Sequence, residues 1–274
     1  MKIFLDDKWV KESEARTPVY EAGFLYAQGL FETMRAYNRK VFRIDSHIDR
    51  LLQSLPIINL NLNYTRKTLK DIIIKTISLN SLGISSYVRL TVWQGEGYTH
   101  TSVIVKEYTS YPEEKYLCGA RAILSKTMQD ESSVLVTIKS SARLHFLLAE
   151  YEAKTKNADA AILLNSKGKV AEATRSNIFV IKNNAIFTSQ AESGCLLGIT
   201  RQTVIDIARR LKIKLYEKEL DPREVFLADE VFITNSLIEI MPLTFLDGKK
   251  IGDGKMGKLT EIFLEKYREL ALKG

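Results

Sequence analysis

The segment Val134-Leu135-Val136-Thr137-Ile138-Lys139 is the clearest starting point for the fold. Its apolar and β-branched side chains predict a short buried strand that ends at Lys139. A helix is expected over residues 142–156, directly after it, with small and acidic side chains on one face. Most lysines are solvated surface charges, but one held against a core loses affinity for its proton, which frees the amine to form a Schiff base.

Downstream of Lys139 come an acidic residue and a glycine that precedes a helix. Glu172 follows the short strand Lys169–Val170, where it is either a turn residue or a carboxylate that faces a ring nitrogen. Gly198-Ile199-Thr200 precedes a helix expected over residues 201–211. A glycine there lets backbone N–H groups approach an anion, to which Thr200 could add a hydroxyl, although Thr200 could equally be a simple helix N-cap.

An arginine in the first half could supply a cation for the same anion. Arg50 lies in His47-Ile48-Asp49-Arg50-Leu51, within a helix predicted to end at Leu55 from the spacing of its apolar residues. A guanidinium can bind phosphate through two parallel hydrogen bonds. Taken alone, Arg50 is an exposed helix residue, and His47 is expected on the surface of the same helix.

The composition is that of an ordinary soluble globular chain. The 274 residues are 45% hydrophobic and 27% charged, with a formal net charge of +7. This excess of basic residues is either a solvated surface or a source of attraction for anionic ligands. Nucleic-acid binding is possible on charge alone, but no basic tail or aromatic-basic stripe supports it, so we do not expect it.

The cysteines and the apolar runs indicate a reducing, aqueous location. Cys118 and Cys195 lie far apart in sequence, so they form neither a disulfide framework nor a metal-ligand pattern. No cluster of His, Cys and Asp suggests a metal site. The chain begins without a signal-peptide pattern, and no segment approaches the roughly 20 apolar residues of a membrane helix. The expected location is the cytoplasm, without a membrane partner.

The order of the expected elements predicts an α+β fold in two domains. Short strands are mixed with helices, without the regular alternation of a doubly wound sheet. The apolar pattern breaks at Pro112, which two glutamates follow. We expect a small α+β domain over residues 1–112, a linker over 113–118 and a larger, barrel-like α+β domain over 119–274.

Taken in order, these segments resemble the class IV aminotransferases, the fold type IV pyridoxal phosphate enzymes. The resemblance runs from about Tyr26 to Thr260 and also rests on Tyr26–Arg35 and Phe42–Leu51. It implies the two-domain fold of D-amino acid aminotransferases, with pyridoxal 5′-phosphate bound between the domains. It further implies a homodimer, in which the neighbouring chain helps to wall the site.

The resemblance also implies roles for single residues. Lys139 is similar to the family's Schiff-base lysine, and Glu172 to the partner of the pyridine nitrogen, which keeps the ring a strong electron acceptor. The residues similar to the phosphate holders are Arg50, Gly198, Ile199, Thr200 and Ser236. The residues expected to face the substrate are Phe31, Arg143 and Asn235.

Three activities share this scaffold, and local motifs favour one of them. Lys139 followed by Arg143-Leu144, and the segment Asn235–Leu243, are similar to patterns of 4-amino-4-deoxychorismate lyases, which release pyruvate and 4-aminobenzoate in the folate pathway. Arg143 replaces the usual aromatic or leucine and would suit a substrate with two carboxylates. The alternatives are a branched-chain aminotransferase, which Arg35-Ala36-Tyr37 resembles, and a D-amino acid aminotransferase, which would need an arginine where Tyr98 stands before His100.

Overall fold

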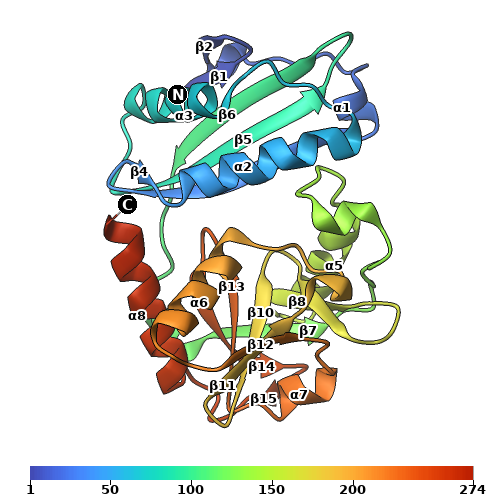
Figure 1. Ribbon diagram of the computed structural model, residues 1–274, viewed down its shortest axis with the longest axis vertical. Coiled ribbons are helices and arrows are strands. Elements are labelled where there is room, and N and C mark those ends of the chain that lie inside the picture. Colours follow the sequence, from blue (N-terminus) through green and yellow to red (C-terminus); the bar gives the residue numbers. More distant parts are fainter. Residues whose placement is uncertain (274) are drawn as a thin grey trace. The chain divides into compact units, whose positions relative to one another are not determined.

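The computed structural model describes residues 1–273, which form two compact units (Figure 1). Unit 1 contains Met1–Ser110, the short stretch Ile138–Ala142 and the residues from Ala271 on. Unit 2 contains Tyr111–Thr137 and Arg143–Leu270. The chain therefore leaves unit 2 and re-enters unit 1 for the few residues around Lys139. None of the helices within residues 1–273 combines the length and the apolar character needed to cross a membrane.

The sheet of unit 1 contains six strands within the described residues, in the order β2-β1-β6-β5-β3-β4, and each neighbouring pair is antiparallel. In chain order the strands are β1 (Lys2–Leu5), β2 (Lys8–Lys11), β3 (Gly29–Tyr37), β4 (Lys40–Val41), β5 (Ser85–Gln94) and β6 (Thr99–Glu107). The helices are η1 (Glu12–Glu14), α1 (Ala22–Leu25), α2 (Ile44–Ser54), η2 (Leu55–Ile58) and α3 (Arg66–Ser78).

Alternation along the strands gives this sheet two different faces. Val88, Leu90 and Val92 of β5 are buried in one core with the apolar side chains of α2 and α3. Residues at the odd positions of β3 and β5, including Phe31 and Arg89, lie on the other face because successive side chains of a strand point to opposite sides. The two helices thus cover one face, and Phe31 and Arg89 lie on the other.

The sheet of unit 2 approaches a closed barrel. Its strand order is β12-β11-β10-β13-β14-β7-β8-β9, with β15 paired to β14. The two end strands meet at an isolated bridge, where the Val170 N–H donates to the Leu220 carbonyl at 2.9 Å. The strands are β7 (Ala120–Leu124), β8 (Ala160–Leu164), β9 (Val170–Ala173), β10 (Asn177–Lys182), β11 (Ala185–Ser189), β12 (Leu215–Lys218), β13 (Glu230–Asn235), β14 (Glu239–Leu246) and β15 (Lys249–Lys250).

Helices accompany this barrel-like sheet. They are α4 (Glu113–Cys118), η3 (Val134–Thr137), α5 (Leu144–Thr155), η4 (Ala191–Ser193), α6 (Ile199–Arg210), α7 (Pro222–Phe226) and α8 (Lys258–Lys273). Phe146, Ala149 and Ala153 of α5 pack on Ile123 and Leu163 of the sheet. The expected α+β class is therefore confirmed, with mixed parallel and antiparallel strand pairs in unit 2.

Residues 113–118, expected to be a linker, are helical in the structure. These residues form α4, with Pro112 as the N-cap residue and two glutamates in the first turn. Acidic side chains at that end interact favourably with the helix dipole, and Gly119 ends the helix at φ 74°, a conformation that glycine adopts at no steric cost. The break in the apolar pattern at Pro112 therefore marks the start of a helix.

The predicted strand that ends at Lys139 is also wrong. Val134–Thr137 forms the 3-10 helix η3, closed locally by a hydrogen bond from the Thr137 hydroxyl to the Val134 carbonyl at 2.7 Å. Val134 and Leu135 are exposed, so no sheet covers them. A short apolar run can be strand or helix, and local hydroxyl bonds decided the outcome here.

Candidate active site

The predicted site residues divide between the two units. Phe31, Arg50 and Lys139 belong to unit 1. Unit 2 holds Arg143, Glu172, Gly198, Ile199, Thr200, Asn235 and Ser236.

The start of β3 holds the backbone around Lys139. The Phe31 N–H donates to the Lys139 carbonyl at 3.0 Å, and the Ser141 N–H donates to the Gly29 carbonyl at 2.9 Å. Gly29 is required for this approach, since a Cβ there would lie 2.8 Å from the Val92 carbonyl oxygen. The Lys139 amine lies 4.8 Å from the centroid of the Phe31 ring. The lysine is thus half-buried and held beside an apolar surface.

Arg89 of β5 is a functional candidate that the sequence did not reveal. Its guanidinium carbon lies 3.9 Å from the centroid of the same Phe31 ring, and its Nε donates to the Thr91 hydroxyl at 3.1 Å. Two cations, the Lys139 amine and the Arg89 guanidinium, therefore share one aromatic ring. The alternation of β5 indicated which face Arg89 occupies, but only the pairing of β5 with β3 brings it to Phe31.

Arg50 is held by a buried carboxylate. Its Nε and Nη2 donate to the two Glu32 oxygens at 2.8 and 2.7 Å, and His47 Nδ1 lies 2.6 Å from Glu32 Oε2. The prediction that His47 lies on the helix surface is wrong, because its side chain is only 3% exposed. Burial alone would raise the pKa of Glu32, but the Arg50 charge and the His47 contact lower that pKa to about 2.

The protonation states of Glu32 and His47 follow from their burial beside Arg50. Burial lowers the pKa of His47, the charges on Arg50 and Lys139 lower it further, and the Glu32 contact only partly opposes them. A neutral His47 must carry its proton on Nδ1, since the ionised Glu32 carboxylate can only accept. Glu32 thus carries one negative charge against one positive charge on Arg50.

In unit 2, Glu172 and Asn177 hold the loop that leads into α6. The Leu196 N–H donates to Glu172 Oε2 at 3.3 Å, and the Asn177 amide donates to the Leu196 carbonyl at 2.7 Å. Gly198 packs so closely that a Cβ would lie 2.2 Å from Asn177 Oδ1. Glu172 is buried, and its charge adds to burial in raising the pKa of the Cys195 thiol to about 12. The predicted acid and the predicted glycine are therefore neighbours.

The N-terminus of α6 has the donors that an anion needs. Gly198 is the N-cap residue and has no side chain to accept the N–H groups of the first turn. The alternative in which Thr200 is the N-cap is therefore wrong, since Thr200 lies within the helix and is buried. Within unit 2, a helix start without a side-chain cap and a buried carboxylate fit the phosphate and the ring nitrogen of pyridoxal phosphate.

The Asn235 side chain holds a turn of unit 2, and its predicted contact with substrate stays a prediction. Its amide donates to the Arg175 carbonyl and the Ser176 hydroxyl, and its oxygen accepts from the N–H groups of Leu237 and Ile238. These four bonds use the full capacity of an asparagine amide. Asn235 therefore shapes the turn that carries Ser236.

Arg143 also has partners within unit 2. Its Nη2 donates to the Thr174 carbonyl at 2.8 Å, and its guanidinium lies 3.9 Å from the Phe146 ring centroid. These contacts hold the side chain along the start of α5, where Arg143 is the N-cap residue. A role in substrate binding remains a prediction for this residue.

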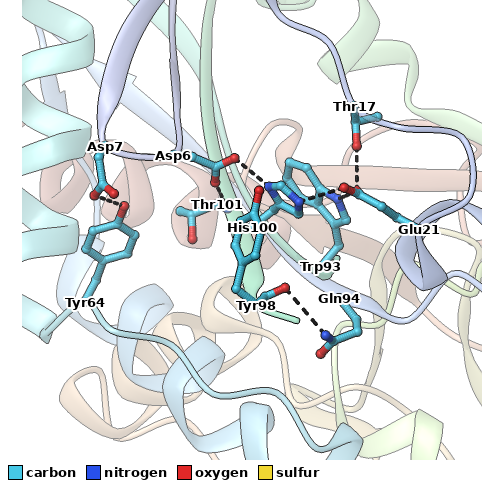
Figure 2. A network of polar contacts seen from close by, with 10 residues as sticks. All are labelled: Asp6, Asp7, Thr17, Glu21, Tyr64, Trp93, Gln94, Tyr98, His100 and Thr101. Carbon is cyan, nitrogen blue, oxygen red and sulfur yellow. Dashed lines mark hydrogen bonds and ion pairs between the residues drawn. The ribbon is translucent and has the colours of Figure 1, made fainter. Parts of the chain in front are cut away.

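His100 belongs to a separate polar network in unit 1 (Figure 2). Its Nδ1 lies 2.5 Å from Asp6 Oδ2, and its Nε2 lies 2.7 Å from Glu21 Oε1. Glu21 also accepts hydrogen bonds from Trp93 and Thr17, both at 2.8 Å. Two carboxylates thus face the ring of His100, an environment that repels a further carboxylate.

Comparison with known proteins identifies one family over most of the chain. The sequence profile of the family described as amino-transferase class IV matches residues 29–245. The branched-chain-amino-acid aminotransferase of Pseudomonas aeruginosa is 33% identical, covering 98% of this chain and 92% of that protein. The D-alanine aminotransferase of Listeria innocua is 32% identical, over 95% of this chain and 92% of that protein.

A solved structure has the same fold. The T.th. branched-chain amino acid aminotransferase, crystallised with pyridoxamine 5′-phosphate, superposes with a TM-score of 0.95 at 27% identity, covering 99% of this chain and 94% of that one. Family profile, relatives and structure agree over nearly the whole length, and the chain belongs to the class IV aminotransferases.

Proposed function

We propose that this protein is a pyridoxal phosphate-dependent transaminase that acts on branched-chain amino acids. The observation that carries the proposal is the pair of cations on the Phe31 ring, with the Lys139 amine at 4.8 Å and the Arg89 guanidinium at 3.9 Å. A site that transaminates an aliphatic amino acid needs a lysine amine that exchanges with the substrate amine, a cation that binds the substrate carboxylate and an apolar wall beside the substrate side chain. The branched-chain relative and solved structure support this choice of substrate.

Each proposed residue has one task toward the cofactor. When bound, pyridoxal phosphate supplies an aldehyde that combines with amines and a ring that accepts an electron pair. Arg50, Ser236 and the N-terminus of α6 would hold the phosphate, and Glu172 would hold a proton on the ring nitrogen. Lys139 would move the substrate's α-proton at its Nζ, while Arg89 orients the carboxylate.

The 4-amino-4-deoxychorismate lyase activity has less support than the sequence motifs indicated. Asn235 serves the turn before β14, and Glu239 pairs with Arg268 at 2.8 Å, so the motif that contains them has a structural explanation. Arg143 likewise packs on Phe146. Both features that favoured the lyase are thus accounted for by the fold.

D-alanine transamination is the second candidate, because the Listeria innocua relative covers nearly the whole chain. The surroundings of His100 oppose it. An imidazole between Asp6 and Glu21 lies in an acidic environment and is poorly suited to receive a carboxylate (Figure 2).

A substrate panel tests the assignment. We expect glutamate to form from 2-oxoglutarate with leucine, isoleucine or valine, little with D-alanine, and no 4-aminobenzoate from aminodeoxychorismate. Arg89→Met should raise the KM for 2-oxoglutarate about tenfold or more, since a charge-assisted bond to a carboxylate is lost. Release of 4-aminobenzoate with pyruvate, and no glutamate from any branched-chain substrate, would reverse the assignment.

We also propose that the working unit is a homodimer that uses α5. Leu144, Leu147, Leu148 and Tyr151 recur at helical spacing and are between 42% and 68% exposed, while Phe146 and Ala149 cover the opposite side. A helix with a second apolar stripe exposed on its outer side, besides the stripe packed on its own sheet, normally has a partner there. A second copy supplies an identical apolar patch.

Sedimentation velocity checks this interface. The wild type should sediment as a dimer, and Leu148→Arg should shift it toward the monomer, because a buried unpaired guanidinium opposes association. The control is Leu227→Arg, which makes the same change at a leucine that is 70% exposed at the end of α7. A monomeric wild type, or equal effects of both variants, would contradict the interface.

A further inference from the structure

We infer that Glu32 is a positioning residue that aims Arg50 at the cofactor phosphate. The inference rests on the proposed function and assigns it a residue that does not touch the cofactor. Glu32 lies on β3, next to Phe31, and is 1% exposed. The same strand therefore holds the Lys139 backbone through Gly29 and Phe31 and holds Arg50 through Glu32.

The geometry fixes one edge of the guanidinium. Arg50 Nε and Nη2 bond to the two oxygens of one carboxylate, an arrangement that sets both the plane and the direction of the group. Nη1 then lies on the opposite edge, because the guanidinium is planar and rigid. Glu32 is itself fixed by His47 at 2.6 Å, from one turn earlier in α2. A long, flexible side chain is thereby held in place before a ligand binds.

Glu32 could also have the opposite effect on phosphate binding and weaken it. The carboxylate neutralises Arg50, so it could weaken the attraction for a phosphate rather than organise it. Two features favour positioning. Both Glu32 oxygens accept from one edge of the Arg50 guanidinium, which fixes its direction, and the pKa of Glu32 is lowered to about 2, so the arrangement persists at neutral pH.

The preference of the protein for a ligand that carries a phosphate distinguishes a positioning role of Glu32 from a general loss of structure. Cofactor-free protein is titrated with pyridoxal 5′-phosphate and with pyridoxal, which lacks only the phosphate, and the dissociation constant for pyridoxal is divided by that for pyridoxal 5′-phosphate. Glu32→Gln should lower this ratio roughly tenfold to a hundredfold, the range for a charge-assisted bond that loses its geometry. The dissociation constant for pyridoxal should change little.

A double-mutant cycle shows whether Glu32 acts through Arg50. Arg50→Met should lower the ratio at least as far as Glu32→Gln, and the double variant should match Arg50→Met alone. Glu21→Gln is the matched control, since Glu21 is a buried carboxylate of the same unit with its own network, and it should leave the ratio unchanged (Figure 2). If Glu32→Gln fails to fold, Glu32→Asp is used in its place, because aspartate keeps the negative charge on a shorter side chain.

The outcomes distinguish this inference from the proposed function. If wild-type protein forms no borohydride-reducible adduct with pyridoxal phosphate, the proposed function fails. If the adduct forms but the ratio is unchanged or raised in the Glu32 variants, only the inference is overturned. An equal fall in Glu21→Gln, or a further fall when Glu32→Gln is added to Arg50→Met, overturns it as well.

Discussion

Lys139→Ala is expected to lower the rate of transamination by about three orders of magnitude or more. The side chain is the amine held beside the Phe31 ring, and its loss removes both the covalent attachment of the cofactor and the group that moves the α-proton. The backbone bonds from Phe31 and Ser141 do not depend on the side chain, so the variant should fold. Steady-state rates with leucine and 2-oxoglutarate measure the effect.

A covalent label provides an independent measurement for the same variant. Borohydride reduction of the loaded wild type should add the cofactor mass to the peptide that contains Lys139, and the variant should show no such adduct. Lys106→Ala removes an exposed lysine from β6 of the same unit and should retain both rate and label. Wild-type turnover in Lys139→Ala would exclude the assigned role.

Glu172→Gln is expected to lower kcat by about a hundredfold or more, with cofactor still attached to the protein. A carboxylate can hold a proton on the ring nitrogen, whereas a neutral amide cannot, so the ring accepts electrons less well. The amide oxygen can still accept the Leu196 N–H, so the loop before α6 should keep its conformation. The comparison of kcat with cofactor content, measured by absorbance after alkali release, separates chemistry from binding.

The matched control for Glu172 is Glu152→Gln. Glu152 is a half-buried carboxylate of α5 in the same unit, which accepts hydrogen bonds from Ser125, Lys126 and Lys156. Its variant should keep wild-type kcat. If Glu172→Gln loses cofactor and activity in equal proportion, Glu172 acts only in binding, and the role at the ring nitrogen would be wrong.

The linear sequence was sufficient for the family and the class of fold. The family follows from segments of a few residues in a fixed order, such as Phe42–Leu51 and the helix start at Gly198. The class of fold follows also from the apolar periodicity of the longer helices. The glycine before α6 was also recognisable from sequence, because a helix start needs few distant partners. The N-cap residue itself was misjudged by two positions.

Some short sequence patterns are compatible with two environments, and only the structure shows which one is adopted. Val134–Thr137 carries a strand-like pattern, but no sheet covers it, and local hydroxyl bonds turn it into η3. Asn235 was expected to face the substrate, and its side chain makes four hydrogen bonds within a turn. In each case the local pattern was compatible with two environments.

The sequence by itself determined the family and the α+β class, and it indicated Lys139, Glu172 and the helix start at Gly198 as the proposed site. Only the tertiary structure decided that His47 is buried on Glu32, that Glu32 grips Arg50, and that Arg89 shares a ring with Lys139. The physical reason is that the pairing of β3 with β5 and the packing of α2 on β3 join residues tens of positions apart. Their burial and charge depend on those partners, which no local pattern encodes.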